Sequence, residues 1–229
     1  MLEKWVGLIL SIFLAMGLLG VSVGYASIPL LKPSFDGKVS VEKAIKERRT
    51  IRDFRERTLS LAHLSQLLWV AQGITDPKEG KRAAPSGGAL YPLDIYVLIG
   101  ENGVERVEAG VYHYQPEKHS LLIVTKGDRR KEIASVALYQ MWMAKAPVIF
   151  LITAEYRRIT GKYGERGIRY ALIEVGHVGQ NLFLQAEALG LGAGIVGAFN
   201  DLEVSKVTGL PPKHEPLLIM PVGYKSKPR

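Results

Sequence analysis

Three arginines and one threonine lie within five consecutive positions of the sequence, as Arg48, Arg49, Thr50 and Arg52. A guanidinium group binds phosphate through two parallel hydrogen bonds, and a threonine hydroxyl adds a neutral donor. This arginine cluster therefore favours a site for a phosphate-bearing cofactor. Basic side chains also bind the terminal carbonyl groups of a helix, so a solvated charged patch at a helix end is the competing interpretation.

A second candidate is the glycine-containing stretch PSGGALYP, which begins with Pro85, Ser86, Gly87 and Gly88. Residues with little or no side chain let a ligand approach the backbone closely, so the N–H groups of this stretch could contact the polar edge of a flat ring. A tight turn before a strand would use the same glycines. The stretch alone does not separate these two interpretations.

Two further features carry less chemistry than they first suggest. Residues 192–197 read GAGIVG and match the dinucleotide pattern G-x-G-x-x-G, which binds pyrophosphate where it follows a strand and opens a helix. Here it follows the longest predicted helix and leads into a strand, which favours a helix end and a closely packed strand.

No two histidines have metal-ligand spacing, and His177 is expected in the core or an interface, so no metal site is predicted.

The composition fits one folded domain with an N-terminal extension. The chain has 229 residues, of which 47% are hydrophobic and 23% charged, enough for a substantial core. Its formal charge of +8 favours anionic partners. Aromatic and basic residues are not interleaved as on nucleic-acid platforms, so nucleic acid is not expected. The absence of cysteine excludes disulfides, thiolate metal sites and cysteine nucleophiles.

The N-terminal residues are predicted to enter a membrane. No charged residue lies between Trp5 and Ala26, and about twenty apolar residues suffice for a helix to cross the hydrocarbon layer. Residues 1–27 are therefore interpreted as a transmembrane anchor or a signal peptide. The cleavage signals are weak and several lysines follow the segment, which favours a retained single-pass anchor with the soluble domain on the cytoplasmic side.

Helical and strand patterns alternate after a linker at residues 28–38. Helices are expected at 41–47 after a Ser40 cap, 61–72 after a Ser60 cap, 128–144, 166–189 and 201–208 after an Asn200 cap. Strands are expected at 94–99, 111–114, 121–124, 147–154, 194–198 and 216–222, and a long loop at 75–88. This order predicts an α+β fold with helices packed on a mixed sheet.

Four motifs taken together resemble the FMN-dependent nitroreductase superfamily. They are RRTxRxF from Arg48, PSGGALYP from Pro85, RYALIEVGHVGQN from Arg169 and PVGY from Pro221. The resemblance is greatest to the SagB-type branch, which includes the azoline oxidases of thiazole and oxazole peptide synthesis. It implies a nitroreductase-like FMN-binding domain at residues 39–229, with a mixed sheet flanked by helices, that forms a homodimer.

The same resemblance implies how FMN is held. The phosphate and ribityl chain would be bound by Arg48, Arg49, Thr50 and Arg52, approached by Lys225 and Lys227. Because this family binds FMN at the dimer interface, the isoalloxazine ring of the other subunit's flavin would be bordered by Pro85, Ser86, Gly87 and Gly88. Backbone would pass along the flavin at Gly197 and Ala198.

A proton-transfer pair is predicted at Lys162 and Tyr163. Removal of hydride from a carbon beside a heteroatom also requires a proton transfer, which a lysine and an adjacent tyrosine near the flavin can perform. The azoline oxidases that the chain resembles use a Lys-Tyr pair. A solvated lysine and a tyrosine packed at the start of the long helix are the alternative.

The predicted function is an FMN-dependent oxidoreductase that transfers two electrons through the flavin, with a small-molecule or peptide-derived substrate. Classical nitroreductases often have Asn where this chain has Ala89 and an acidic residue where it has Gly197, so nitro substrates and NAD(P)H do not follow from the resemblance. No peptide-binding extension is recognisable either. The alternative is a membrane-tethered basic binding protein with the same fold that has lost flavin chemistry.

Overall fold

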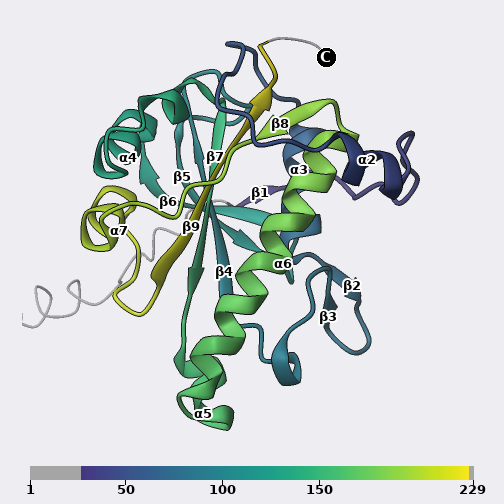
Figure 1. Ribbon diagram of the computed structural model, residues 1–229, viewed down its shortest axis with the longest axis vertical. Coiled ribbons are helices and arrows are strands. Elements are labelled where there is room, and N and C mark those ends of the chain that lie inside the picture. Colours follow the sequence, from purple (N-terminus) through teal and green to yellow (C-terminus); the bar gives the residue numbers. More distant parts are fainter. Residues whose placement is uncertain (1–26, 227–229) are drawn as a thin grey trace, which may run out of the picture.

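The computed structural model describes residues 27–226, which fold around one seven-stranded sheet (Figure 1). The strand order is β1-β6-β5-β4-β7-β9-β8, and the ladders between these strands are antiparallel. One parallel bridge, between Thr50 and Ala193 in β8, is added at the β8 edge. The sheet is therefore mixed, and its parallel contact involves the arginine cluster.

The elements alternate along the chain as the sequence pattern predicts. The strands are β1 Ile28–Pro29, β2 Ile74–Asp76, β3 Lys81–Arg82, β4 Leu93–Ile99, β5 Gly110–Gln115, β6 Ser120–Lys126, β7 Val148–Ala154, β8 Leu191–Ala193 and β9 Glu215–Tyr224. The helices are α2 Val41–Glu47, α3 Leu61–Gln72, α4 Arg130–Val136, α5 Arg157–Tyr163, α6 Arg166–Ala188 and α7 Asp201–Thr208, with 3-10 turns η1 Gly87–Ala89 and η2 Met141–Lys145.

Helices cover both faces of the sheet, which explains why β4 and β7 are apolar along most of their length. Phe150 and Ile152 of β7 pack in a core layer with α3 and α6. Ile149 and Leu151, which alternate with them, pack in a second layer with α4 and α7. Figure 1 shows α6 running along its face of the sheet as the longest helix of the domain.

The three predicted N-caps are confirmed. The side chain of Ser40 accepts a hydrogen bond from the Lys43 N–H, and Ser60 and Asn200 cap α3 and α7 in the same way. Each cap satisfies an amide that the first helical turn leaves without an intrahelical partner. The cap at Ser40 fixes where α2 begins and therefore where the arginine cluster leaves it.

Four local predictions differ from the structure. The predicted loop at 75–88 contains the small β2–β3 hairpin and the turn η1. The predicted helix at 128–144 is divided into α4 and η2, because Leu138 and Tyr139 have left-handed φ angles of 54° and 56° that an α-helix does not accept. Helix α5 was not predicted, and the strand expected at 194–198 lies earlier, as β8.

The predicted linker lies against the domain rather than away from it. Ile28 and Pro29 pair with β6, and the Leu31 N–H donates to Ser65 Oγ of α3 at 3.0 Å. The membrane segment predicted before it falls outside residues 27–226 and stays a prediction. Within those described residues, no helix is both long and apolar enough to cross a membrane.

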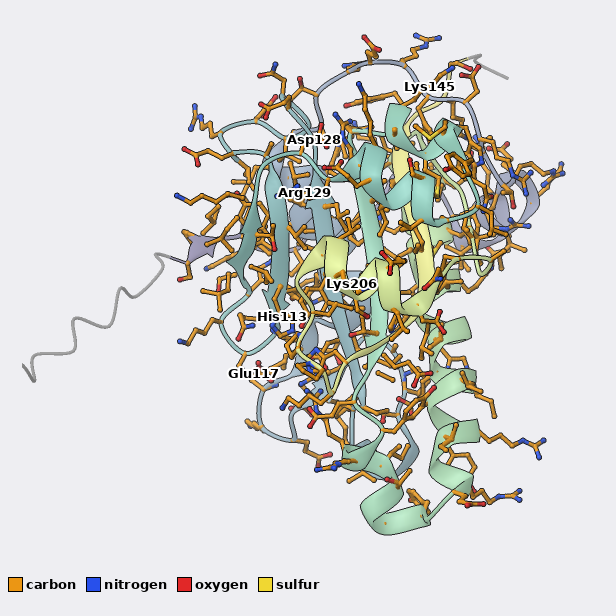
Figure 2. The ribbon with its side chains drawn as sticks, turned by 90° about the vertical axis from the view of Figure 1, so that its left-hand side faces the viewer. His113, Glu117, Asp128, Arg129, Lys145 and Lys206 are labelled. Carbon is orange, nitrogen blue, oxygen red and sulfur yellow. The ribbon has the colours of Figure 1, made fainter. Side chains whose placement is uncertain are left out.

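A partly buried polar network connects β4, β5 and α5, and Figure 2 labels one of its members, His113 of β5. His113 Nε2 is 3.0 Å from Asp94 Oδ1, and Tyr96 Oη is 2.7 Å from His214 Nδ1. Arg158 of α5 reaches Asp94 Oδ2 at 2.8 Å. Desolvation raises the pKa of Asp94, but the His113 hydrogen bond and the Arg158 charge outweigh it, so the pKa lies below its usual value. The network thereby fixes α5 to the sheet.

We expect the domain to lose stability as the pH falls from 7 to 5. Burial lowers the pKa of His214, so below about pH 6.5 the unfolded chain binds a proton that the folded chain does not. The free energy of unfolding should therefore decrease in this window. In His214→Asn, whose side-chain amide can still bond Tyr96, urea unfolding at pH 7, 6 and 5 should show a smaller decrease. Equal decreases in parent and variant would show that His214 does not cause the loss of stability at low pH.

Candidate functional site

The arginine cluster is held at the β8 edge of the sheet by backbone contacts. The Ile51 N–H donates to the Ala193 carbonyl at 2.8 Å, beside the bridge between Thr50 and Ala193. Further along, the Arg55 N–H donates to the Tyr224 carbonyl at 2.9 Å. These bonds satisfy the edge of the sheet and bring the cluster next to the C-terminal end of β9, where Lys225 follows.

The three guanidinium groups of the cluster have different neighbours. Arg49 Nη1 donates to the Lys46 and Arg48 carbonyls at 2.8 Å each, which is the helix-end bonding that the alternative interpretation expects. Arg48 lies 5.0 Å from the centre of the Phe183 ring, and Arg52 lies 5.9 Å from that of Trp142. Within the described chain none of the three forms an ion pair with a carboxylate, which leaves their charge available to an anion.

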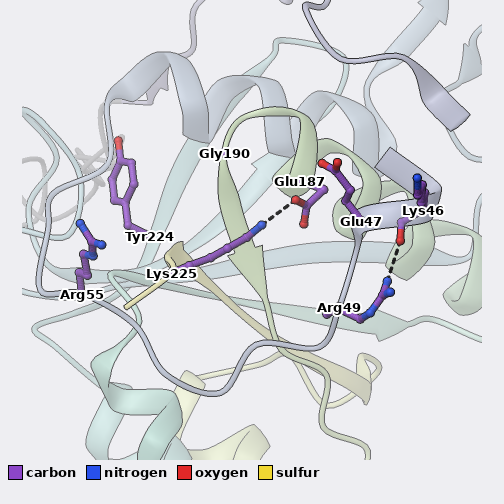
Figure 3. Close-up of a pocket in the computed structure, with 8 residues that line it drawn as sticks. All are labelled: Lys46, Glu47, Arg49, Arg55, Glu187, Gly190, Tyr224 and Lys225. Carbon is purple, nitrogen blue, oxygen red and sulfur yellow. Dashed lines mark hydrogen bonds and ion pairs between the residues drawn. The ribbon is translucent and has the colours of Figure 1, made fainter. Parts of the chain in front are cut away.

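An open pocket of about 610 Å³ lies between α2, the end of α6 and the end of β9 (Figure 3). Of the predicted phosphate residues, it brings together Arg49 and Lys225. Lys225 Nζ is 2.6 Å from Glu187 Oε1, so this lysine is ion-paired. The other lining residues are Lys46, Glu47, Arg55, Gly190 and Tyr224. Lys227 lies outside the described residues.

The predicted pair Lys162 and Tyr163 lies beside the glycine-containing stretch. These two residues end α5, and a Cβ built on Gly88 would lie 2.7 Å from Tyr163 Oη and 3.0 Å from Lys162 Nζ. Gly88 also has a left-handed φ of 63°. Glycine is therefore favoured there for two reasons, the backbone conformation and the lack of space for a Cβ. Folding thus brings together two groups that lie more than seventy residues apart in the sequence.

Sequence reasoning missed Glu174, which holds this stretch in place. Glu174 Oε1 accepts hydrogen bonds from Ser86 Oγ at 3.0 Å and from the Gly87 N–H at 2.8 Å. Its side chain is buried, and desolvation raises the pKa of the carboxyl although both hydrogen bonds oppose that shift. The available signal was a carboxylate on the apolar face of a long helix, where a charge needs a specific partner.

Gly197 and Ala198 lie on the surface just after β8. No atom lies within 4 Å of the position that a Cβ on Gly197 would take, so the backbone there is open to a ligand. The glycines before it serve packing, as the sequence predicts. A Cβ on Gly192 would lie 2.7 Å from Ile51, and one on Gly194 would lie 2.6 Å from Trp142.

The two groups of candidate residues lie at opposite parts of α6. Lys225 is paired with Glu187 near the end of this helix, whereas the Ser86–Gly88 stretch is bonded to Glu174. At a rise of about 1.5 Å per residue, these two glutamates lie about 20 Å apart along the helix axis. Arg48, which lies over Phe183, is nine residues or about 14 Å beyond Glu174 along the same axis.

The family model for nitroreductases matches residues 45–224. The chain belongs to the nitroreductase family. It is 45% identical to MJ1384 of Methanocaldococcus jannaschii, a protein named as a nitroreductase, over 188 residues that cover 82% of this chain and 92% of that protein. It is 28% identical to the microcin B17-processing protein McbC of Escherichia coli over 189 residues, or 79% of this chain and 70% of McbC.

Solved structures agree with this assignment. A chain of the E. coli microcin synthetase McbBCD complex, solved with truncated pro-MccB17 bound, matches with a TM-score of 0.68 and 28% identity over 86% of this nitroreductase-family chain and 78% of that chain. A nitroreductase structure from Ralstonia eutropha shares the fold with a TM-score of 0.75 over 91% and 93% of the two chains, at 24% identity. The predicted resemblance to nitroreductases and to their SagB-like processing relatives is confirmed.

We expect Gly88→Ala to move Tyr163, whereas Gly80→Ala should not. Both glycines have φ of 63°, so each alanine should cost about 1–2 kcal/mol of folding free energy for the left-handed backbone. Of the two, only the new methyl group at Gly88 meets other side chains, those of Lys162 and Tyr163. Fluorine NMR of 3-fluorotyrosine protein, with Tyr163→Phe for assignment, measures the shift. An unchanged Tyr163 signal in Gly88→Ala would show that the two groups do not touch.

Proposed function

We propose that this chain is an FMN-dependent oxidoreductase that functions as a homodimer. The observation that carries the proposal is the separation along α6 of the arginine cluster from the Ser86–Gly88 stretch. Each group is half of a flavin site, and a twofold axis would supply the other half from a second copy. Members of the nitroreductase family generally bind FMN, which makes this cofactor the first candidate.

The residues at the two half-sites fit FMN chemically. The arginine cluster supplies guanidinium groups that form no ion pair within the described residues, and one of them, Arg49, lines the neighbouring pocket of about 610 Å³. Gly87, Gly88 and Gly197 expose backbone without side chains, as close approach to a flat ring requires. When bound, the flavin would supply the two-electron redox chemistry.

A second copy would also cover apolar surface that one chain leaves open. On α6 the exposed large apolar side chains are Ile168, Leu172 and Ile173, and on α2 they are Val41 and Ile45. A helix that is apolar on two faces needs a partner on each. His177 lies on the same open face of α6, which agrees with a place in an interface rather than in the core.

Lys162 and Tyr163 are the proposed proton-transfer groups for the substrate. Their polar atoms lie against Gly88, so they would face the ring edge that the loop borders. A positioned acid or base typically contributes a factor of about 10²–10⁴ to the rate. The name of the relative McbC describes processing of microcin B17, so a peptide-derived substrate is a candidate beside the nitro compound that the name of MJ1384 suggests.

We expect the purified protein to be yellow and Arg48→Ala to lose FMN without unfolding. A charge-assisted phosphate contact contributes about 1.5–3 kcal/mol, which corresponds to more than tenfold in affinity. Arg106→Ala is the matched control, because Arg106 is an exposed arginine in the loop between β4 and β5 and belongs neither to the arginine cluster nor to the pocket lining. Fluorescence titration with FMN measures both. A colourless parent protein that does not bind added FMN would reject the proposal and favour the binding-protein alternative.

We expect Lys162→Ala and Tyr163→Phe to retain FMN and its reduction by dithionite, because neither residue belongs to the phosphate half-site. Oxidation of a thiazoline-containing peptide should fall by about 10²–10⁴ in each variant. Lys206→Ala, on the far helix α7, should behave as the parent (Figure 2). Unchanged turnover in both α5 variants, or loss of flavin, would remove the pair from the mechanism.

A further inference from the structure

The turn around η1 has an unusual backbone. Gly88 has φ of 63°, and it is followed by two residues with side chains in the left-handed region, Ala89 at 55° and Tyr91 at 46°. L-residues adopt this region rarely, and a strained backbone persists only where its surroundings hold it. The turn therefore needs a restraint from outside its own sequence.

One carboxylate supplies a restraint on both ends of the turn, in addition to the bond from Arg158 to the Tyr91 carbonyl at 3.2 Å. The Tyr91 N–H donates to Ser86 Oγ at 2.8 Å, and this hydroxyl in turn donates to Glu174 Oε1 at 3.0 Å. The Gly87 N–H donates to the same oxygen at 2.8 Å. Both ends of the turn are therefore connected to Glu174, directly at Gly87 and through the Ser86 hydroxyl at Tyr91.

Glu174 is an unusual side chain for a core position. It is 3% exposed, and its second oxygen, Oε2, has no hydrogen-bond partner in the part of the chain that the structure describes. Buried carboxylates are normally paired with a cation. Glu187, which like Glu174 belongs to α6, is paired in this way with Lys225. A buried carboxylate that bonds only a loop is costly unless the placement of that loop matters.

We infer that Glu174 is a positioning residue for the flavin bound mainly by the other subunit. By fixing Ser86 and Gly87, it sets the backbone that borders the ring of that flavin. This inference rests on the proposed function and adds to it a residue on α6 that contacts neither phosphate nor substrate. Because Arg48 of the same chain lies over Phe183, nine residues or about 14 Å beyond Glu174 along α6, loss of Glu174 should damage the site across the interface.

Complementation between two defective chains tests this inference. Glu174→Ala, with an intact arginine cluster, and Arg48→Ala, with an intact loop, are co-expressed with different tags and purified through both. Each variant alone should bind FMN at least tenfold more weakly than the parent. In the mixed dimer one site receives both intact halves, so half of the sites should regain parental affinity. A mixed dimer without a parent-like site would overturn the inference.

Two variants exclude a general effect on folding. Ser86→Ala removes the hydroxyl that connects the Tyr91 N–H to Glu174 but retains Glu174 itself. This variant should weaken FMN binding in the same way as Glu174→Ala. Ser65→Ala is the matched control, because Ser65 Oγ also accepts a backbone N–H and donates to a carbonyl, but in α3. Its FMN affinity should stay within threefold of the parent. Glu174→Gln, which keeps an acceptor oxygen, should bind FMN more tightly than Glu174→Ala. Equal weakening by Ser65→Ala would contradict a specific role.

Hydrogen exchange without FMN separates this inference from the proposed function. The amides of Gly87 and Tyr91 should exchange at least tenfold faster in Glu174→Ala than in the parent, whether or not flavin binds. If the parent does not bind FMN, the proposed function fails. If the exchange rates are unchanged, Glu174 does not hold the turn and the inference fails by itself.

Discussion

The rigidity of α6 is the constraint on which the candidate site depends. The helix has 23 residues and is therefore about 35 Å long, and its apolar side packs on the sheet for most of that length. The Ser86–Gly88 turn is bonded near its middle, at Glu174, whereas the arginine cluster and Lys225 lie near its C-terminal end. A packed helix does not bend to bring two such groups together, and this constraint is the reason for proposing a second chain.

The charged groups of the two proposed half-sites differ in their exposure to solvent, and this difference determines what each group can do. At the proposed phosphate half-site the basic groups are partly exposed and outnumber the carboxylates, so an anionic ligand would bind there at little cost. Around the turn, Glu174 is buried and bonded to neutral donors, and burial raises the pKa of its carboxyl. Its role there is geometric, since a hydrogen-bonded buried oxygen fixes donors within narrow distances.

Much of the architecture was predictable from local patterns. The buried strands β4 and β7, the caps of α2, α3 and α7, and the length of α6 follow from periodicity and cap residues. Helix α5 was missed because Ile159, Thr160 and Gly161 lower its intrinsic helix propensity, and its stability comes from tertiary contacts of Ile159 and Arg158. The break at Leu138 has no local signal, because neither it nor Tyr139 favours a left-handed backbone.

The site was predictable in its residue types more than in its geometry. The arginine cluster, the glycine-containing turn and the Lys-Tyr pair could be named from motifs, and the structure places the turn and the pair in contact at Gly88. The bonds of Arg49 to the carbonyls of Lys46 and Arg48 are local, and the helix-end interpretation of the cluster expected them. The pairing of Lys225 with Glu187 was not predictable, because it depends on two segments that meet only in the fold. The role of Glu174 was not predicted, because this residue lies among the apolar positions of α6. The spacing of those positions predicts a buried helix face but gives no information on hydrogen bonds.

The contacts of α5 show how the substrate side is fixed independently of the phosphate side. Arg158 bonds the Tyr91 carbonyl at 3.2 Å and Asp94 at 2.8 Å, so α5, the end of the turn and β4 form one unit. The arginine cluster is held instead by β8 and the end of β9. Residues on α5 take no part in these backbone bonds, so we expect substitutions on α5 to leave the position of the arginine cluster unchanged.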